Sequence, residues 1–206
     1  MFLMVRYGIP FLANFAGFIS GLNKTNTTQE KNETSFVSPP ILDPLPSVTN
    51  KPELEIKGQA ADKEKVSVFV NDALVDTKNT NEDGSFTFKV FLKEGENKIK
   101  AKATIGDKES DYSDEEIIVY KEKEPTLEIK SPSDGQKFEK DQNPIQVTGT
   151  TDEGVRVTVN DFWAIMNGSN FSYSLTLQNG ENNINVIATD EAENKTEKSV
   201  KVTYSP

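Results

Sequence analysis

Two neighbouring aromatic residues are the part of this sequence best suited to contact a ligand. Phe162 and Trp163 follow an Asn-Asp pair, and Trp163 is the only tryptophan in the chain. Exposed at a hairpin tip, such rings can stack on a sugar ring or on a partner chain. The competing interpretation, which we favour, is that Trp163 covers the end of a hydrophobic core. Phe162 and Trp163 are therefore the candidate ligand contacts.

Carboxylates in expected loops form a second set of candidates, because their oxygens are the ligands that Ca²⁺ prefers. The loop acids are Asp107, Asp111 and Asp114 in one half and Asp190, Glu191 and Glu193 in the other, and acids near the junction are Glu122, Glu124, Asp134 and Asp152. Neither loop matches the spacing of an EF-hand. We favour solvated turns over calcium sites, and we predict no metal or cofactor.

The composition excludes most hydrolytic chemistry. The 206 residues include no His and no Cys, so neither a Ser-His-Asp nor a Cys-His arrangement can be built. Among 33 acidic residues some pair will always have a spacing suited to glycoside hydrolysis, so such a pair predicts little. The net charge of −10 and the absence of a basic stripe argue against nucleic-acid binding. We therefore expect a protein that is not an enzyme.

The elements that carry these residues come from a sequence written twice. A strand, a Gly-Glu-Asn turn and a second strand occupy residues 86–104 and again residues 171–189. We interpret each copy as a β-hairpin, because Phe86 and Phe171 open runs that alternate apolar and polar residues. In these stretches Gly95 and Gly180 provide the turn, and the side chains of Asn97 and Asn182 can bond nearby backbone groups.

Further strands with the same alternation surround each copy, and turn signals recur every 8–12 residues or so, which is typical of an antiparallel sandwich. Asn71-Asp72 and Asn160-Asp161 are expected turns, and residues 105–113 an expected polar loop. The fold class predicted is all-β, with two tandem immunoglobulin-like sandwiches at residues 40–122 and 124–206, preceded by a transmembrane helix and a disordered tether.

The N-terminal segment differs from everything after it. Residues 2–22 are almost entirely apolar apart from Arg6, and as a helix they reach across a bilayer. We predict a transmembrane anchor at residues 1–22 and a flexible linker at 23–39, with a cleaved signal peptide as the main alternative. Arg6 weakly places the N-terminus in the cytoplasm. The expected location is therefore the cell membrane, single-pass, with the C-terminal domains outside the cytoplasm.

A family resemblance covers both repeats. The second contains Ser131-Pro-x-x-Gly135, Val147-Thr-Gly149, Gly180-Glu-Asn182 and Asp190-x-Ala-x-Asn194. This pattern resembles bacterial immunoglobulin-like repeats of the glucodextranase B-like type, in the arrangement of a membrane-anchored tandem-module surface protein. The first repeat resembles the same family but lacks the Ser-Pro-x-x-Gly entry and the Asp-x-Ala-x-Asn loop.

The resemblance implies modules that serve as spacers, adhesin stalks or accessory domains. We therefore expect a non-enzymatic, membrane-anchored extracellular module that acts as a spacer, adhesion or protein-interaction element. The alternative is a carbohydrate-binding accessory module. The expected partners are the membrane, through residues 2–22, and either another surface protein or a glycan.

Overall fold

The structure is a computed structural model that describes residues 36–206. The predicted anchor at residues 1–22 and most of the predicted linker at 23–39 lie outside these residues. In the part that is described, no helix has both the length and the apolar character needed to cross a bilayer.

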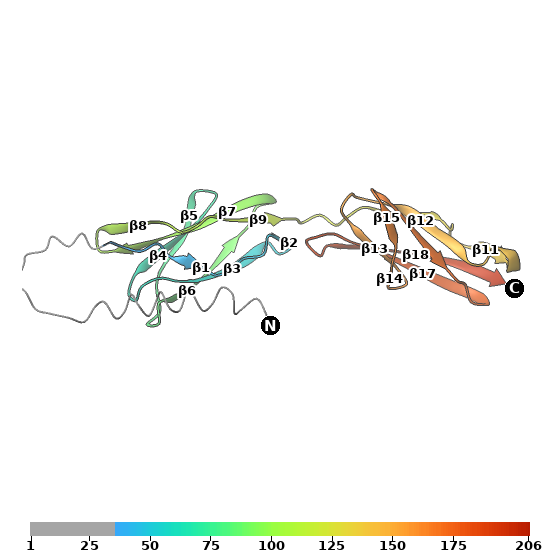
Figure 1. The fold of residues 1–206 in the computed structure, drawn as a ribbon, viewed down its shortest axis with the longest axis horizontal. Helices are drawn as coiled ribbons and strands as arrows, with labels where there is room; N and C mark the ends of the chain where they lie inside the picture. Colours follow the sequence, from blue (N-terminus) through green and yellow to red (C-terminus); the bar gives the residue numbers. More distant parts are fainter. Residues whose placement is uncertain (1–35) are drawn as a thin grey trace, which may run out of the picture. The chain divides into compact units, whose positions relative to one another are not determined.

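Residues 41–120 fold into two sheets, shown in blue to green in Figure 1. The smaller sheet has the strand order β1-β3-β6, and the larger has the order β2-β9-β7-β4-β5, with β8 paired to β7. The strands are β1 (Ile41–Leu42), β2 (Val48–Thr49), β3 (Glu53–Gln59), β4 (Lys65–Val70), β5 (Ala73–Asn79), β6 (Ser85–Phe91), β7 (Gly95–Ile105), β8 (Lys108–Tyr112) and β9 (Glu116–Tyr120). We call this unit the first sandwich.

The core of the first sandwich lies between its two sheets. In β3, β4, β6 and β7 every second residue is buried, as expected when one face of each strand is turned away from water. Ile56 and Phe88 from the smaller sheet share one apolar cluster with Val68 and Ile99 from the larger sheet, and all four side chains are fully buried. The period-2 pattern in the sequence therefore specifies which residues form the core.

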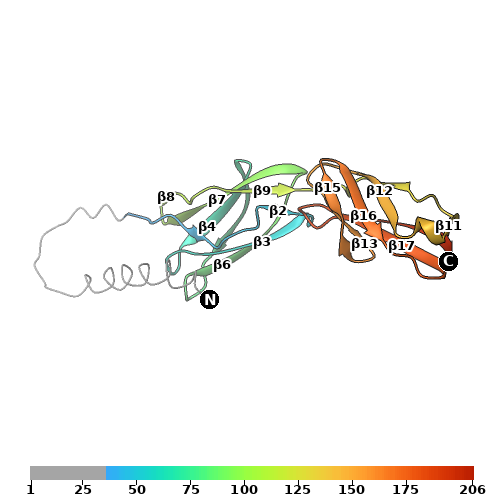
Figure 2. The same cartoon turned by 45° about the vertical axis from the view of Figure 1, so that its right-hand side comes forward.

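Residues 127–205 repeat this arrangement, and Figure 2 shows the strands from a second direction. One sheet has the order β10-β12-β16-β15 and the other the order β11-β18-β17-β13-β14. The strands are β10 (Leu127–Ser131), β11 (Gln136–Glu139), β12 (Ile145–Thr151), β13 (Arg156–Val159), β14 (Phe162–Trp163), β15 (Ile165–Asn167), β16 (Asn170–Leu175), β17 (Gly180–Thr189) and β18 (Lys195–Ser205). We call this unit the second sandwich.

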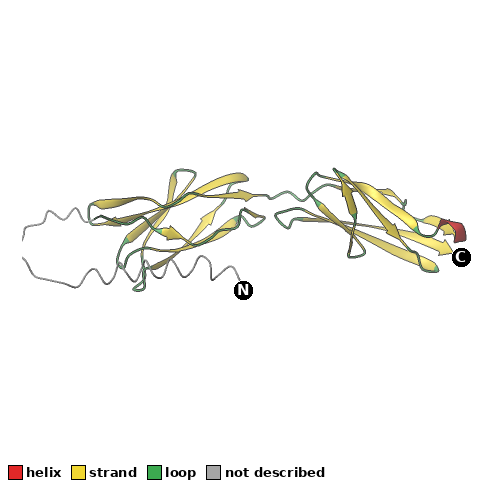
Figure 3. Ribbon diagram, in the orientation of Figure 1, coloured by secondary structure: helices red, strands yellow, loops and turns green. Residues whose placement is uncertain are grey.

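The all-β sandwich architecture predicted from the sequence is confirmed (Figure 3). The only helical element among the described residues is the short 3₁₀ turn η1 (Lys140–Gln142). No described strand pairs across the connector, residues 121–126, and each sandwich has its own apolar cluster. The boundaries at 40–122 and 124–206 stay predictions.

The interpretation of the repeated stretch as a hairpin is wrong. Strand β6 belongs to one sheet and β7 to the other, and the same is true of β16 and β17. The Gly-Glu-Asn residues therefore begin the second strand of each copy, and the chain changes sheets just before them. We call residues 92–97 and 177–182 the corners between the sheets. The error has a physical cause, because strands that face each other across a core show the same period-2 alternation as strands that pair within one sheet.

The predicted chemistry of this corner is confirmed. The Asn97 side chain accepts a hydrogen bond from Lys93 N at 2.9 Å and donates to Lys93 O at 2.7 Å and Gly95 O at 3.0 Å. Asn182 makes the same three bonds to Gln178 and Gly180. The prediction of a polar loop at residues 105–113 is wrong. The chain turns back at Gly106, and the residues that follow form β8, which pairs with β7.

Candidate functional site

Phe162 and Trp163 lie where the sequence places them, directly after a tight turn. Asn160 and Asp161 have φ values of 48° and 69°, the left-handed conformation that a two-residue hairpin turn requires. Strand β14 then pairs with β13, with Trp163 opposite Thr158. Because successive residues of a strand point to opposite faces, Phe162 and Trp163 are directed to different sides of the sheet.

The contacts of the two rings agree with this difference. Phe162 stacks on Tyr173 of β16, in the other sheet, with ring centroids 6.3 Å apart. The guanidinium carbon of Arg156, on β13, lies 5.7 Å from the Trp163 ring centroid. Arg156 also forms a 3.0 Å ion pair with Glu193. The two aromatic residues therefore do not form one shared platform.

Both side chains are largely exposed. Phe162 retains 63% and Trp163 64% of its accessible surface. The favoured interpretation that Trp163 covers the end of the core is therefore wrong, because so exposed an indole removes little core surface from water. A ligand contact by Phe162 or Trp163 stays a prediction.

A second group of side chains holds the connector to the second sandwich. The loop between β17 and β18 is closed by Asp190, whose carboxylate accepts hydrogen bonds from Asn194 N at 2.8 Å and Asn194 Nδ2 at 3.1 Å. Asn194 Nδ2 also donates to Lys121 O at 2.9 Å. Asp190 and Asn194 are both buried. The Asp190-x-Ala-x-Asn194 motif thus orients an amide that binds the incoming chain.

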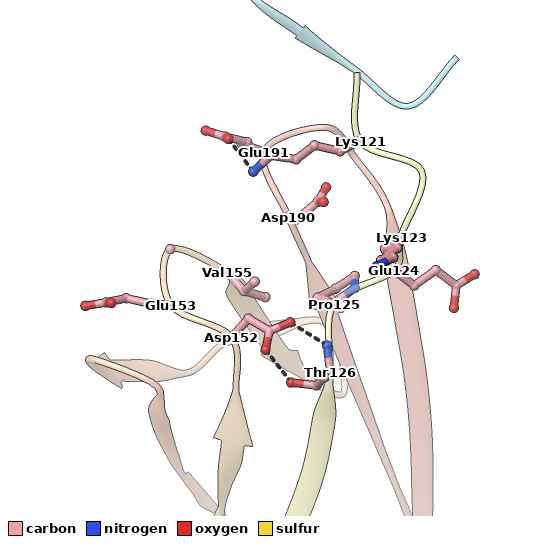
Figure 4. Close-up of a pocket in the computed structure, with 11 residues that line it drawn as sticks. Lys121, Lys123, Glu124, Pro125, Thr126, Asp152, Glu153, Val155, Asp190 and Glu191 are labelled. Carbon is pink, nitrogen blue, oxygen red and sulfur yellow. Dashed lines mark hydrogen bonds and ion pairs between the residues drawn. The ribbon is translucent and has the colours of Figure 1, made fainter. Parts of the chain in front are cut away.

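Asp152 holds the next part of the connector, as Figure 4 shows. Its carboxylate accepts hydrogen bonds from Thr126 N at 2.8 Å and from the Thr126 hydroxyl at 2.6 Å. These donors, the hydroxyl first, hold the pKa of Asp152 below its ordinary value. Two further hydroxyls bond connector carbonyls, Thr151 Oγ1 to Thr126 O at 2.6 Å and Thr196 Oγ1 to Pro125 O.

An open hollow of about 450 Å³ lies beside these contacts. Its lining is strongly charged and includes Glu124, Glu153, Asp190 and the ion pair between Lys121 and Glu191, whose atoms are 2.6 Å apart. This carboxylate raises the pKa of Lys121. Five residues of the second sandwich bond the connector, and Asp190 orients one of them, Asn194. We name these six residues the connector clasp: Thr151, Asp152, Asp190, Glu191, Asn194 and Thr196.

Three of the acids considered as calcium ligands accept hydrogen bonds from backbone groups. Across residues 36–206, no group of three or more acidic side chains is placed to hold a metal ion. Asp152 and Asp190 accept hydrogen bonds from backbone N–H groups, and Asp134 does so from Lys201 N at 2.8 Å. These carboxylates therefore stabilise turns and strand ends.

Sequence reasoning missed several residues of both groups. Arg156 and Thr158 alternate with buried valines on β13, so the sequence indicates that they lie on the outer face. Their proximity to Trp163 depends on the pairing register of β13 and β14, which the sequence does not specify. Asn194 was recognised within a motif without a role. Its contact with Lys121 joins residues far apart in the sequence, which no local pattern specifies.

Comparison with known proteins connects the second sandwich to a family. Residues 125–205 match the family described as "Glucodextranase, domain B". The second sandwich is therefore similar to this family along its length. The predicted resemblance to bacterial immunoglobulin-like repeats of this type is thus confirmed. The matched span begins at residue 125, which lies in the connector.

One curated relative is Bacillopeptidase F of Bacillus subtilis (strain 168), which is 31% identical over 152 residues. The match covers 74% of this chain but 11% of that protein, so the chain spans about a tenth of its relative.

Two solved structures have similar folds at low identity. The fibronectin(III)-like modules of Clostridium thermocellum CbhA share 20% identity at a TM-score of 0.49, over 84% of this chain and 92% of theirs. A fragment of a 1.5-MDa bacterial ice-binding adhesin shares 16% at 0.44, over 83% of this chain and 66% of its own.

Proposed function

We propose that this chain is a non-enzymatic module that acts as a spacer, adhesion or protein-interaction element at a bacterial cell surface. Its two sandwiches are presented outside the cytoplasm by a membrane anchor at residues 2–22. The lack of His and Cys removes the usual catalytic triads.

The observation that carries the spacer function is the connector clasp. A short connector with exposed, unpaired backbone would act as a free hinge. Here Lys121, Pro125 and Thr126 each offer backbone groups to side chains of the second sandwich. A segment held in this way keeps its path into the second sandwich, as a spacer that positions a partner requires.

Trypsin cleavage tests this role, because Lys121 and Lys123 place two cleavage sites in the connector. We expect the connector of the full chain to resist trypsin, and Asn194→Ala combined with Asp152→Ala to raise cleavage there at least tenfold. Glu153→Gln, a change in the same hollow at a residue outside the clasp, is the matched control. Equal cleavage of the parent and the double variant would refute a clasp-held connector.

The membrane anchor has its own test. Fractionation of cells without detergent should leave the full chain in the membrane fraction, and removal of residues 2–22 should release it. External protease added to intact cells should digest the sandwiches. A full chain found in the soluble fraction would overturn the anchored location and leave the spacer function to be judged by the trypsin experiment.

A second candidate function is binding of a glycan as an accessory module. The observation that favours it is the 64% exposure of Trp163 beside the guanidinium of Arg156. A glycan array probed with the parent chain and with Trp163→Ala checks it. Binding that is unchanged by the substitution, or absent with the parent chain, would count against this candidate.

A further inference from the structure

The outer faces of the two smaller sheets differ in charge. In the first sandwich this face, on β3 and β6, carries Glu53, Glu55, Lys57 and Lys89, all exposed. Two ion pairs join these side chains, Lys89 to Glu53 and Lys57 to Glu55, each with atoms 3.0 Å apart. Such a face is suited to water, because the centres of protein interfaces are depleted of charged residues.

In the second sandwich three of the four strands in the corresponding sheet carry no charge. Strands β12, β15 and β16 contain no Asp, Glu, Lys or Arg, and neither does any residue from 162 to 180. The charged residues of this sheet, Glu128 and Lys130, are confined to β10, at the edge opposite β15. We name the outward-facing residues of the other three strands the uncharged face: Thr148, Ile165, Asn167, Asn170, Ser172 and Ser174.

Strand pairing brings these side chains together. Ser172 lies between Thr148 of β12 and Ile165 of β15, its partners in the two neighbouring strands. An open hollow of about 360 Å³ lies among them, and Ile165 beside it is 74% exposed. Asn167 and Asn170, which lie opposite each other, also line the hollow. Their side-chain amides have no hydrogen-bond partner within residues 36–206, so they can bond another chain.

The charge of the whole chain decides which partner this face suits. Two copies of a chain with a net charge of −10 repel each other, and like charges brought together at an interface are costly. A contact between copies is therefore favoured where neither copy presents a charge. A basic partner would instead be attracted to the acidic surface elsewhere on the chain. Two identical uncharged faces also meet the requirement of a two-fold contact, in which the same patch is used on both sides.

We propose that the uncharged face of the second sandwich binds the same face of a second copy of the chain, in a two-fold symmetric pair. Ile165 supplies the exposed apolar contact, and the amides of Asn167 and Asn170 supply hydrogen bonds between the copies. This inference rests on the proposed adhesion or protein-interaction function and names its partner.

Sedimentation velocity of the full chain in detergent tests the pair. We expect a monomer–dimer equilibrium, and we expect Ile165→Lys to raise its dissociation constant at least tenfold, because the change adds a cation to both contacting faces. Phe91→Lys is the matched control, since Phe91 is 72% exposed on the corresponding face of the first sandwich. It should dimerise as the parent does. A parent that stays monomeric, or an Ile165→Lys variant that associates as the parent does, overturns the proposal.

The absence of cysteine in the chain allows a second measurement. Ser174→Cys places a single thiol on the uncharged face, on β16, where residue 174 is exposed. Thr87→Cys places one on β6, the corresponding strand of the first sandwich, where residue 87 is also exposed. With diamide as the oxidant, we expect Ser174→Cys to form a disulfide-linked dimer in much higher yield. A yield no higher than that of Thr87→Cys contradicts the pairing of these faces.

Salt separates this contact from association through ion pairs. Added salt screens the repulsion between two acidic copies, so it should strengthen the dimer. A dimer that weakens as salt is added is held by charged groups and refutes the uncharged face as its interface. A monomeric parent refutes this inference and leaves the spacer function untouched, because trypsin cleavage judges that function separately.

Discussion

The two sandwiches leave the same Asn-Asp turn by different routes. In the first, β5 stays beside β4 along the whole strand, and the register shift at Val68/Phe69 absorbs one extra residue as a bulge. In the second, β14 pairs with β13 for two residues, and the chain then crosses to the other sheet as β15. One hairpin turn therefore starts two different sandwich edges.

The difference decides how the neighbouring sheet edge is protected. In the second sandwich β15 pairs with β16, so β16 is not an edge strand. In the first, β6 is an edge strand, and Lys78 of β5 reaches across to donate to Thr87 O at 3.1 Å. A lysine at an open edge discourages pairing with another chain. The first sandwich thus uses one cation where the second uses a strand.

The length of the connecting segment accounts for the two routes. Fewer residues separate Asn160 from Phe171 than separate Asn71 from Phe86. The shorter segment cannot run the full length of one sheet and return, so it crosses after Trp163, and the hairpin at Gly168 leads into β16. A change in the length of this segment therefore replaces one way of protecting the sheet edge with the other and leaves the core unchanged.

The largest expected effect comes from a glycine that both sandwiches share. A Cβ at Gly149 would collide with Glu128 O and lie 2.5 Å from ring carbons of Phe171. Gly58 is enclosed in the same way by Ile41 O and Phe86. We expect Gly149→Ala to destabilise the second sandwich by about 3 kcal/mol, because the obstacle is backbone as well as side chain.

The same comparison predicts that Gly58→Ala lowers the free energy of unfolding of the first sandwich by less, about 2 kcal/mol. Its neighbour β1 has two residues, whereas β10 beside Gly149 has five, so β1 can shift more easily. Hydrogen exchange followed by peptide mass spectrometry measures each sandwich separately. If Gly58→Ala destabilises its sandwich as much as Gly149→Ala or more, the length of the neighbouring strand does not control how easily that strand moves aside.

The corner asparagines should show an intermediate effect. Asn97 and Asn182 make the same three hydrogen bonds, but Asn97 is fully buried and Asn182 half-buried. Backbone groups that lose their partners cost more where water cannot replace them. We expect Asn97→Ala to cost about 2 kcal/mol and Asn182→Ala about 1 kcal/mol. Denaturation midpoints unchanged in both variants would contradict the structural role.

Much of the fold could be predicted because it is local. The buried alternation, the positive φ of Gly84 and the Asn-Asp turns all follow from residues next to one another in the chain. The pairing of β6 and β7 could not, since facing strands and paired strands share the same alternation. Strand β8 was missed because its polar sequence buries only Ser110.

The candidate site was predicted only in part. The sequence identified Phe162 and Trp163 as candidate ligand contacts, and the structure exposes both. It did not show that they face opposite sides, because the pairing with Thr158 and Val159 decides this.

The smallest expected effect is the pH dependence of the connector clasp. The folded pKa of Asp152 lies below its ordinary value of 3.8 because Thr126 donates through its hydroxyl and its N–H. A depressed folded pKa contributes stability above the unfolded value, and that stability is lost as the pH falls through the folded value. The unfolding midpoint of the second sandwich, read by Trp163 fluorescence, should therefore fall below about pH 4.

Asp152→Asn should flatten this decline, since the amide cannot be protonated and its oxygen can still accept the Thr126 N–H. Asp83→Asn is the matched change in the first sandwich, where Ser85 lowers the pKa of Asp83 through the same two kinds of donor. Asp83 does not contact the connector, so its substitution should leave the pH profile of the second sandwich unchanged. If both variants alter that profile equally, the acid sensitivity belongs to the overall charge and not to the clasp.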